Sequence, residues 1–345
     1  MTPDRSSPAL VDAVVSTQWL ADHLGSERLV VLDASVIVLG ENPDGGASPG
    51  GDAAGAGGAD GVGGAPHGKT RYLSGYDQYL FDGHIPGAFF ADLVESFSAQ
   101  DGPYPFTKPD AEAFTEAARA AGVTADSTIV VYDTAYGQFA ARLWWLLRAF
   151  GHTRVAVLDG GFVRWRAEDR PTEDGHLEPD RGSFTAVEDP ARWVDKAFIE
   201  GVLDGSEAGV LVCGVPPREF AGETGGRVRP GHIPGSFNVP AGRLVDRSTN
   251  RSLPLADLRS RFEPVIASAR ALTAQATRAA TAQTTAARRS VQPSRATIVT
   301  YCAGGVASAA DALALVRLGV EGVAVYDGSL AEWAADPDAP LHTGP

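Results

Sequence analysis

One cysteine in the second half of the chain stands at the start of a loop with almost no side chains. The stretch from Tyr301 to Ser308 reads YCAGGVAS. A thiol is a useful nucleophile only as a thiolate, and backbone N–H groups leading into a helix stabilise an anion. Because glycine adopts positive φ without a steric penalty, Gly304 and Gly305 allow the loop amides to turn inward. We therefore expect Cys302 to be a nucleophile held by the backbone of Ala303, Gly304, Gly305, Val306 and Ala307.

A buried structural role is the alternative for this cysteine. Free cysteine is among the residue types most often found in cores, and Cys302 follows an apolar run. The chain contains a second copy of the same region, however, in which Asp133 takes the position of Cys302. A core position seldom exchanges with aspartate, so the comparison favours a loop mouth. The other cysteine, Cys213, ends an apolar run and is expected to be structural.

The duplication extends over most of the chain. GHIPG occurs from Gly83 and again from Gly231, and VAVLDGGFVRW ending at Trp165 corresponds to VAVYDGSLAEW ending at Trp333. In each copy short β-branched runs alternate with helix-period segments, which is typical of βαβ units around a parallel sheet. Ligands of such sheets bind beyond the carboxyl ends of the strands, where Cys302 is expected.

The length of 345 residues and the repeat predict two domains. We expect an N-terminal domain over 1–170, a linker over 171–190 and a C-terminal domain over 191–345. Two segments break the symmetry of the copies. The Gly-rich stretch 40–68 is predicted to be a flexible surface insertion, and the Ala/Thr/Arg-rich stretch 266–296 is predicted to be disordered or a loose helix. Neither is assigned any chemistry.

Charge and composition exclude several classes of partner. There are 43 Asp and Glu against 29 Lys and Arg, and the net charge of -14 argues against nucleic acid and anionic membrane surfaces. No apolar run reaches the roughly 18 residues of a membrane span, and no secretory signal pattern is present. Two cysteines and seven histidines show no metal-ligand spacing. We expect a cytoplasmic protein without a metal or other cofactor.

The twofold unit, both GHIPG motifs and a single loop cysteine in the second copy together resemble the tandem-domain rhodanese family of sulfurtransferases. The resemblance implies an α/β fold of two tandem rhodanese-like domains, each a mostly parallel sheet flanked by helices. It also implies a catalytic C-terminal domain and an N-terminal copy that lost the cysteine. Cys302 would take a sulfane sulfur from a small donor, hold it as a persulfide, and pass it to cyanide, a small thiol or a protein thiol.

The loop sequence bears on the donor. Relatives that act on thiosulfate carry basic loop residues, whereas those that act on 3-mercaptopyruvate carry Cys-Gly-Ser-Gly-Val-Thr. The uncharged loop here is closer to the second type, although Gly304 and Ala307 replace its hydroxyl residues. Both donors stay open at this point.

A carboxylate donor needs a cation, and arginine suits it. The resemblance points to the segment before the second GHIPG, which contains Arg218, Arg227 and Arg229. It also relates His84 and Tyr104 to cleft residues of mercaptopyruvate enzymes. His84 has a counterpart, His232, in the other GHIPG, so stabilisation of a turn is the alternative for both histidines.

Two rival functions follow from the same fold. A cysteine phosphatase requires an arginine six residues after the nucleophile, and Ser308 stands there, which argues against phosphoryl transfer. A rhodanese-like binding or regulatory module would keep the fold without turnover, and it predicts no persulfide.

Overall fold

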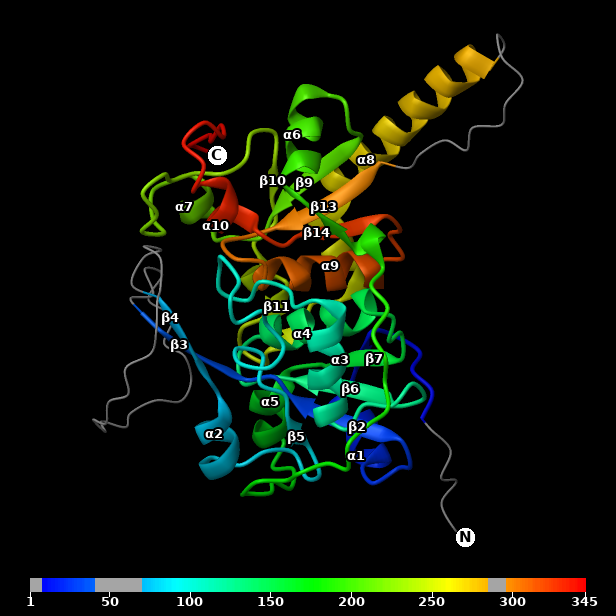
Figure 1. Cartoon of the computed structure of the whole chain (residues 1–345), viewed down its shortest axis with the longest axis vertical. Coiled ribbons are helices and arrows are strands. Elements are labelled where there is room, and N and C mark those ends of the chain that lie inside the picture. Colours follow the sequence, from blue (N-terminus) through cyan, green and yellow to red (C-terminus); the bar gives the residue numbers. More distant parts are fainter. Residues whose placement is uncertain (1–7, 41–69, 285–295) are drawn as a thin grey trace.

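A computed structural model describes residues 8–40, 70–284 and 296–345 of the chain (Figure 1). The predicted Gly-rich insertion therefore lies almost wholly outside the described residues. Each copy of the repeat forms a five-stranded parallel sheet with the same strand order. The first sheet runs β1-β7-β6-β2-β5, with bounds Val14–Val15, Val155–Leu158, Thr128–Tyr132, Leu29–Asp33 and Phe89–Phe90. The second runs β8-β14-β13-β9-β10, with bounds Trp193–Val194, Val323–Tyr326, Thr297–Tyr301, Gly209–Cys213 and Phe237–Asn238.

Helices flank both sheets, and this confirms the predicted α/β class. In the first domain they are α1 (Thr17–His23), α2 (Tyr76–Phe81), α3 (Ala111–Ala120), α4 (Gln138–Ala149) and α5 (Gly161–Ala167). In the second they are α6 (Lys196–Asp204), α7 (Pro217–Phe220), α8 (Leu255–Thr284), α9 (Ala307–Arg317) and α10 (Ser329–Trp333), with the short 3-10 turns η1 (Pro190–Arg192) and η2 (Ala241–Arg243). There are also two small antiparallel strand pairs, β3 (Val36–Leu39) with β4 (Arg71–Ser74), and β11 (Val245–Asp246) with β12 (Arg251–Ser252).

The central strands place the two loops in equivalent positions. β2 pairs with β6 and β9 pairs with β13 over five residues each, so that Tyr132 faces Asp33 and Tyr301 faces Cys213. Apart from their threonines, β6 and β13 consist of buried hydrophobic residues, as expected where helices cover both faces of a parallel sheet. Asp133 and Cys302 are the first residues beyond β6 and β13. Both therefore lie at the carboxyl edge of a sheet.

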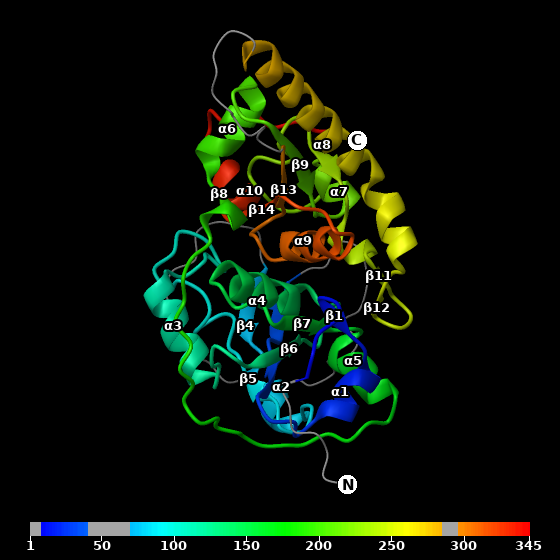
Figure 2. The ribbon, with the colours of Figure 1, turned by 90° about the vertical axis from the view of Figure 1, so that its right-hand side faces the viewer.

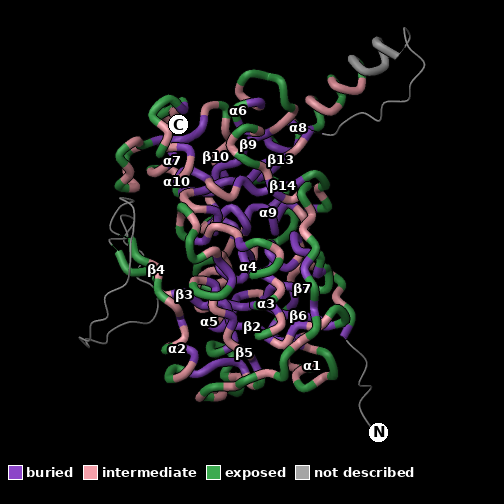
Figure 3. Tube along the Cα trace, viewed as in Figure 1, coloured by how far each residue is buried: buried purple, intermediate pink, exposed green. Residues whose placement is uncertain are grey.

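The two domains meet along the helices that follow these loops. α4 and α9 pack against each other between the two sheets (Figure 2). Trp145 of α4 and Leu315 of α9 are fully buried members of one core cluster that crosses the seam. Figure 3 shows buried residues along both helices and the strands on either side. The domains are therefore joined by a continuous apolar core, in which the side chain of Arg142 is almost completely buried.

The segment predicted as a linker is ordered against the first domain. Residues 171–189 form no helix or extended strand, yet Phe184 donates its amide to Val123 O at 3.0 Å and Val187 donates to Phe150 O at 3.1 Å. The tract predicted at 266–296 continues α8 as far as Thr284. Its remaining residues up to 295 lie outside the described part.

Asp311 is an acid buried in the seam without a partner. It lies on α9 with no exposed surface, and neither carboxyl oxygen has a hydrogen-bond partner among the described residues. Burial raises the pKa of Asp311 well above its usual value. In the unfolded chain an aspartate ionises near a pKa of about 3.9. Above that pH the unfolded chain has released a proton that the folded chain keeps, so stability falls as pH rises toward the folded pKa.

We predict that Asp311→Asn removes this pH dependence. Across the window between the two pKa values, the free energy of unfolding of the parent should fall by up to about 1.4 kcal/mol per pH unit because of this group. Thermal melts of parent and variant at pH 5, 6.5 and 8 measure the effect. The melting temperature of the variant should rise relative to the parent as pH increases. A constant difference would contradict the assignment of a neutral buried acid.

Candidate active site

The loop after β13 leaves several main-chain amides without acceptors. The expected loop mouth is wrong, because Cys302 is 2% exposed and Asp133 is fully buried. The amide of Cys302 donates to Ser329 Oγ at 3.2 Å. The amides of Ala303, Gly304, Gly305 and Val306 donate to no acceptor among the described residues. Val306 is the N-cap of α9, and its side chain offers no capping hydrogen bond. The loop is thus a run of unpaired N–H donors at the start of a helix, an arrangement that favours an anion.

The equivalent loop of the first domain shows which group these amides bind. Asp133 Oδ1 accepts from Ala135 N at 2.9 Å and Gly137 N at 3.0 Å. Its Oδ2 accepts from Phe139 N at 2.9 Å and Ala140 N at 3.0 Å, the first turn of α4. Burial raises the pKa of Asp133, and the hydrogen bonds from Ala140, Gly137, Ala135 and Phe139 act against that rise. The loop of the first domain is therefore a cradle whose four amide donors bind its own carboxylate.

The two loops differ in how far their first side chain reaches. Counting from Asp133 and Cys302, Ala135 corresponds to Gly304 and Gly137 to Val306. The expected contacts between these amides and the Cys302 sulfur are not present among the described residues. The cysteine side chain is too short for these contacts, because a carboxylate oxygen lies one atom beyond Cγ whereas the thiol side chain ends at Sγ. The outer sulfur of a cysteine persulfide restores that length and carries the negative charge.

The first domain closes over the Cys302 loop with a short segment and one arginine. Lys108 donates its amide to Asp327 Oδ2 at 2.8 Å, across the seam. Arg142 Nη2 donates to Asp327 Oδ1 at 2.6 Å, and its Nη1 donates to Gly305 O at 3.3 Å. In the pseudo-equivalent place, Asp159 of the first domain accepts from Ser252 N at 2.7 Å. In each domain one aspartate therefore accepts hydrogen bonds from the other domain, but only Asp327 lies beside the cysteine loop.

Two phenols and a second thiol lie within electrostatic reach of Cys302. Burial, followed by charge on Cys302 and Glu219, raises the pKa of Tyr72 to about 12. Burial also raises the pKa of Tyr136, with charge on Cys302 as the next cause. Burial raises the pKa of Cys213 to about 12, which keeps this thiol protonated. The surroundings of Cys302 therefore contain neutral hydrogen-bond donors, and Cys213 keeps the structural role expected for it.

The three arginines predicted for the donor separate into different roles. Arg218 is 58% exposed and pairs with Glu223 at 3.2 Å. Arg229 donates to the carbonyl oxygens of Asp336 and Ala339, so it fastens the C-terminal segment. Arg227 is 9% exposed and donates from Nη1 to Glu219 at 2.5 Å. Its Nε and Nη2 are buried and have no partner among the described residues. Of the three, Arg227 alone has buried N–H groups that still need an acceptor.

His84 and Tyr104, the other two predicted site residues, lie in different surroundings. His84 is fully buried, its Nδ1 lies 3.0 Å from Tyr79 O, and its ring stacks on Tyr79 at 3.9 Å. His232 makes the same kind of contact with Phe220, which favours the turn-stabilising alternative for both histidines. Burial raises the pKa of Tyr104, followed by charge on Glu332 of the second domain. Tyr104 thus belongs to the segment that reaches the second domain, whereas His84 packs within the first.

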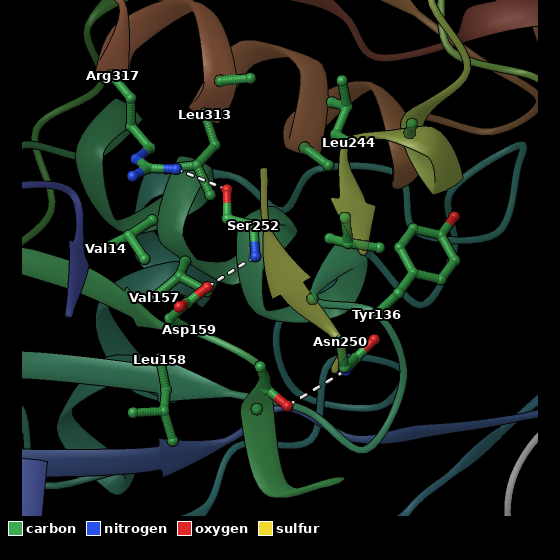
Figure 4. Close-up of a pocket in the computed structure, with 17 residues that line it drawn as sticks. Val14, Tyr136, Val157, Leu158, Asp159, Leu244, Asn250, Ser252, Leu313 and Arg317 are labelled. Carbon is green, nitrogen blue, oxygen red and sulfur yellow. Dashed lines mark hydrogen bonds between the residues drawn. The ribbon is translucent and has the colours of Figure 1, made fainter. Parts of the chain in front are cut away.

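A small cavity lies between the two domains. It has a volume of about 50 Å³, and its lining includes Tyr136, Asp159, Asn250, Ser252 and Arg317 (Figure 4). Cys302 is not among the lining residues. Its polar groups bind each other, since Arg317 donates to Ser252 Oγ at 2.6 Å and Asn250 donates to Gly160 O at 3.2 Å. The cavity is therefore a satisfied part of the domain contact and not the reaction site.

Comparisons with known proteins agree with this geometry. A family model for the rhodanese-like domain matches residues 73–168 and 216–336. The chain belongs to the rhodanese-like family. The 3-mercaptopyruvate sulfurtransferase of Escherichia coli (strain K12) is 30% identical over 332 residues, covering 95% of this chain and 96% of that protein. The human 3-mercaptopyruvate sulfurtransferase is 29% identical over 95% of this chain and 94% of that protein.

Structural comparison gives the same family. The crystal structure of SseA from Escherichia coli, described as a 3-mercaptopyruvate sulfotransferase, matches with a TM-score of 0.66 and 29% identity. The match covers 92% of this rhodanese-like chain and 98% of that one. The fold, the repeat and the named relatives together identify this rhodanese-like protein as a sulfurtransferase, which confirms the prediction from the sequence.

No helix within residues 8–40, 70–284 and 296–345 is long and apolar enough to cross a bilayer. In the same ranges no three His, Cys, Asp or Glu side chains gather where they could hold a metal ion.

Sequence reasoning missed the residues that act from the first domain. Arg142 carried a signal, because it is a charge within the apolar helix QFAARLWWLLRA. A buried arginine requires acceptors, which marks it as a contact across the seam. Asp327 belonged to a repeated motif, but its partner in the other domain could not be read from the sequence. Glu219 lies in the same segment as the three candidate arginines, and its pairing with Arg227 could not be read from the sequence.

Proposed function

We propose that Cys302 carries sulfur as a persulfide from a small anionic donor to a thiophilic acceptor. One observation supports this most strongly. The loop amides that bind a carboxylate in the first domain are unpaired in the second, where the side chain is one atom shorter. Adding a sulfur to Cys302 places an anion at the position of the Asp133 oxygens. The loop therefore stabilises the covalent intermediate more than it stabilises the resting thiol.

The first half-reaction with 3-mercaptopyruvate balances without a cofactor. The Cys302 thiolate attacks the donor sulfur, a sulfur–sulfur bond forms, and the carbon–sulfur bond of the donor breaks. The electron pair of that bond goes to carbon as the enolate of pyruvate, which then takes up the proton that the donor thiol lost. The products are the Cys302 persulfide anion and pyruvate. With thiosulfate the same attack releases sulfite.

The charge around Arg227 favours a donor with one carboxylate. Its unpaired Nε and Nη2 form the side-on edge of the guanidinium, which suits bidentate binding of a carboxylate. Glu219 pairs with the same arginine and neutralises its charge. A monoanion such as 3-mercaptopyruvate is therefore accommodated better than the thiosulfate dianion. Relatives with both names exist, since a chicken protein named thiosulfate sulfurtransferase is 32% identical over 74% of this chain.

The second half-reaction returns the thiolate. Cyanide attacks the outer sulfur and leaves as thiocyanate, or a small or protein thiol attacks and becomes a persulfide. In both cases the sulfur–sulfur bond breaks and its electron pair stays on Cys302. The choice among these acceptors and a cytoplasmic location stay predictions from the sequence.

The rival reading is a rhodanese-like module that binds without turnover. It requires Cys302 to stay a thiol under all donors. The relatives named as sulfurtransferases give it no support, and persulfide formation separates the two readings directly.

We predict that 3-mercaptopyruvate adds one sulfur atom to Cys302, because the cradle binds the resulting anion. Mass spectrometry of the Cys302 peptide after incubation with 3-mercaptopyruvate, and separately with thiosulfate, measures this. Cys302→Ser should abolish turnover and leave the melting temperature nearly unchanged, because the two side chains are close in size. Turnover by the serine variant, or an unmodified thiol after both donors, would refute the proposed function.

We also predict that Arg227→Gln raises KM for 3-mercaptopyruvate by about ten- to hundredfold, since hydrogen bonds to charged groups contribute about 1.5–3 kcal/mol. The matched control is Arg218→Gln, which removes an exposed arginine of the same segment. Steady-state kinetics of both variants make the comparison. Equal KM values for Arg227→Gln and the parent would remove Arg227 from the donor site.

A further inference from the structure

We propose that Arg142, which comes from the copy without a cysteine, is a positioning residue for the Cys302 loop. It is 1% exposed, and its guanidinium lies 5.2 Å from the ring of Trp193 in the second domain. Nη2 donates to Phe106 O at 2.7 Å and to Asp327 at 2.6 Å, and Nη1 donates to Gly305 O at 3.3 Å. One side chain therefore contacts the segment at Phe106, the carboxylate of Asp327 and the cysteine loop, and it touches no reacting atom.

The contact with Gly305 sets the direction of one cradle donor. Gly305 O accepts from Arg142 Nη1 and from Ser308 Oγ, the latter at 3.0 Å. In a planar trans peptide the carbonyl and the following N–H point in opposite directions. Holding Gly305 O toward the seam therefore turns the Val306 N–H away from it. Val306 corresponds to Gly137, whose amide binds Asp133 in the other loop. Arg142 thus fixes a donor that the proposed persulfide requires.

Gly305 can take this conformation only as glycine. Its φ is +81°, and a Cβ there would come within 2.8 Å of Asp327 O. The same Cβ position lies 3.5 Å from Arg142 Nη1, so the arginine packs directly on the turn. A side chain with a different shape at position 142 would leave the turn without this support.

Arg142 also cancels a charge beside the loop. Asp327 Oδ1 binds Arg142, and Oδ2 binds the amide of Lys108. Without the guanidinium, the Asp327 carboxylate would lie uncompensated next to the turn and would disfavour an anionic sulfur there. Geometry and charge therefore act in the same direction.

Only the first of the two copies has an arginine in this role. Arg142 and Asp311 each stand nine residues after the first residue of their loop, Asp133 and Cys302 respectively. Across the seam, Asp311 has no partner among the described residues, whereas Arg142 has acceptors in both domains. The copy that lost the nucleophile thus supplies the residue that orients the loop of the copy that kept it.

The test uses Arg142→Lys and Arg142→Gln in the full chain. Both should lower kcat for 3-mercaptopyruvate at least about tenfold with KM within about threefold, because donor binding is left to other residues. The pH midpoint of Cys302 alkylation by iodoacetamide should rise for Arg142→Gln. The lysine variant keeps the charge but not the fork, and it provides a second, milder change if the glutamine variant fails to fold.

The matched control is Arg317→Gln. Arg317 is another mostly buried arginine that crosses the seam, where it pairs with Asp12 at 3.3 Å, but it lies at the far end of α9 (Figure 4). This variant should lower the melting temperature and leave kcat and the alkylation midpoint unchanged. The inference rests on the proposed function, and parent protein that forms no persulfide would refute that function itself. A parent that forms persulfide, beside folded Arg142 variants with unchanged kcat and midpoint, would overturn only the role of Arg142.

Discussion

A short run of main-chain amides without acceptors is the constraint on which the site depends. Buried or half-buried N–H groups are almost always paired in folded proteins, so a loop that leaves several unpaired has an unmet requirement for an anion. The first domain meets that requirement internally with Asp133. In the second, Cys302 ends one atom short. The chain therefore contains a form of the loop filled by its own carboxylate and a form with unpaired amides, which we propose a persulfide on Cys302 completes.

The first domain, which has no cysteine, still contributes to the surroundings of the Cys302 loop. The first copy encloses the second loop through the segment around Phe106 and through Arg142. The apolar seam between α4 and α9 excludes water from these contacts, which strengthens each polar interaction within it. In the proposed mechanism catalysis is divided between the copies, since one would carry the sulfur and the other would hold the loop in shape. The buried Asp311 shows that the seam also includes a group that lowers stability at neutral pH.

Much of the fold could be predicted because it follows from local patterns and repetition. The two copies of GHIPG, the β-branched runs and the exchange of Cys302 for Asp133 placed the loop at the carboxyl edge of the second sheet. The roles of Arg218, Arg227 and Arg229 could not be separated by sequence, because the three differ only in their tertiary partners. Arg229 binds carbonyl groups more than 100 residues away along the chain. The role of Arg142 could not be predicted because two of its acceptors belong to the other domain. The effect of the shorter thiol side chain on the loop amides became apparent only when the structures of both loops were compared.

The most direct measurement is a crystal structure of the protein after treatment with 3-mercaptopyruvate, with the two loops superposed. The account predicts an added sulfur on Cys302 that overlaps the Asp133 carboxylate oxygens and accepts hydrogen bonds from the amides of Gly304 and Val306. A persulfide that points away from these amides, with the loop N–H groups still unpaired, would contradict it.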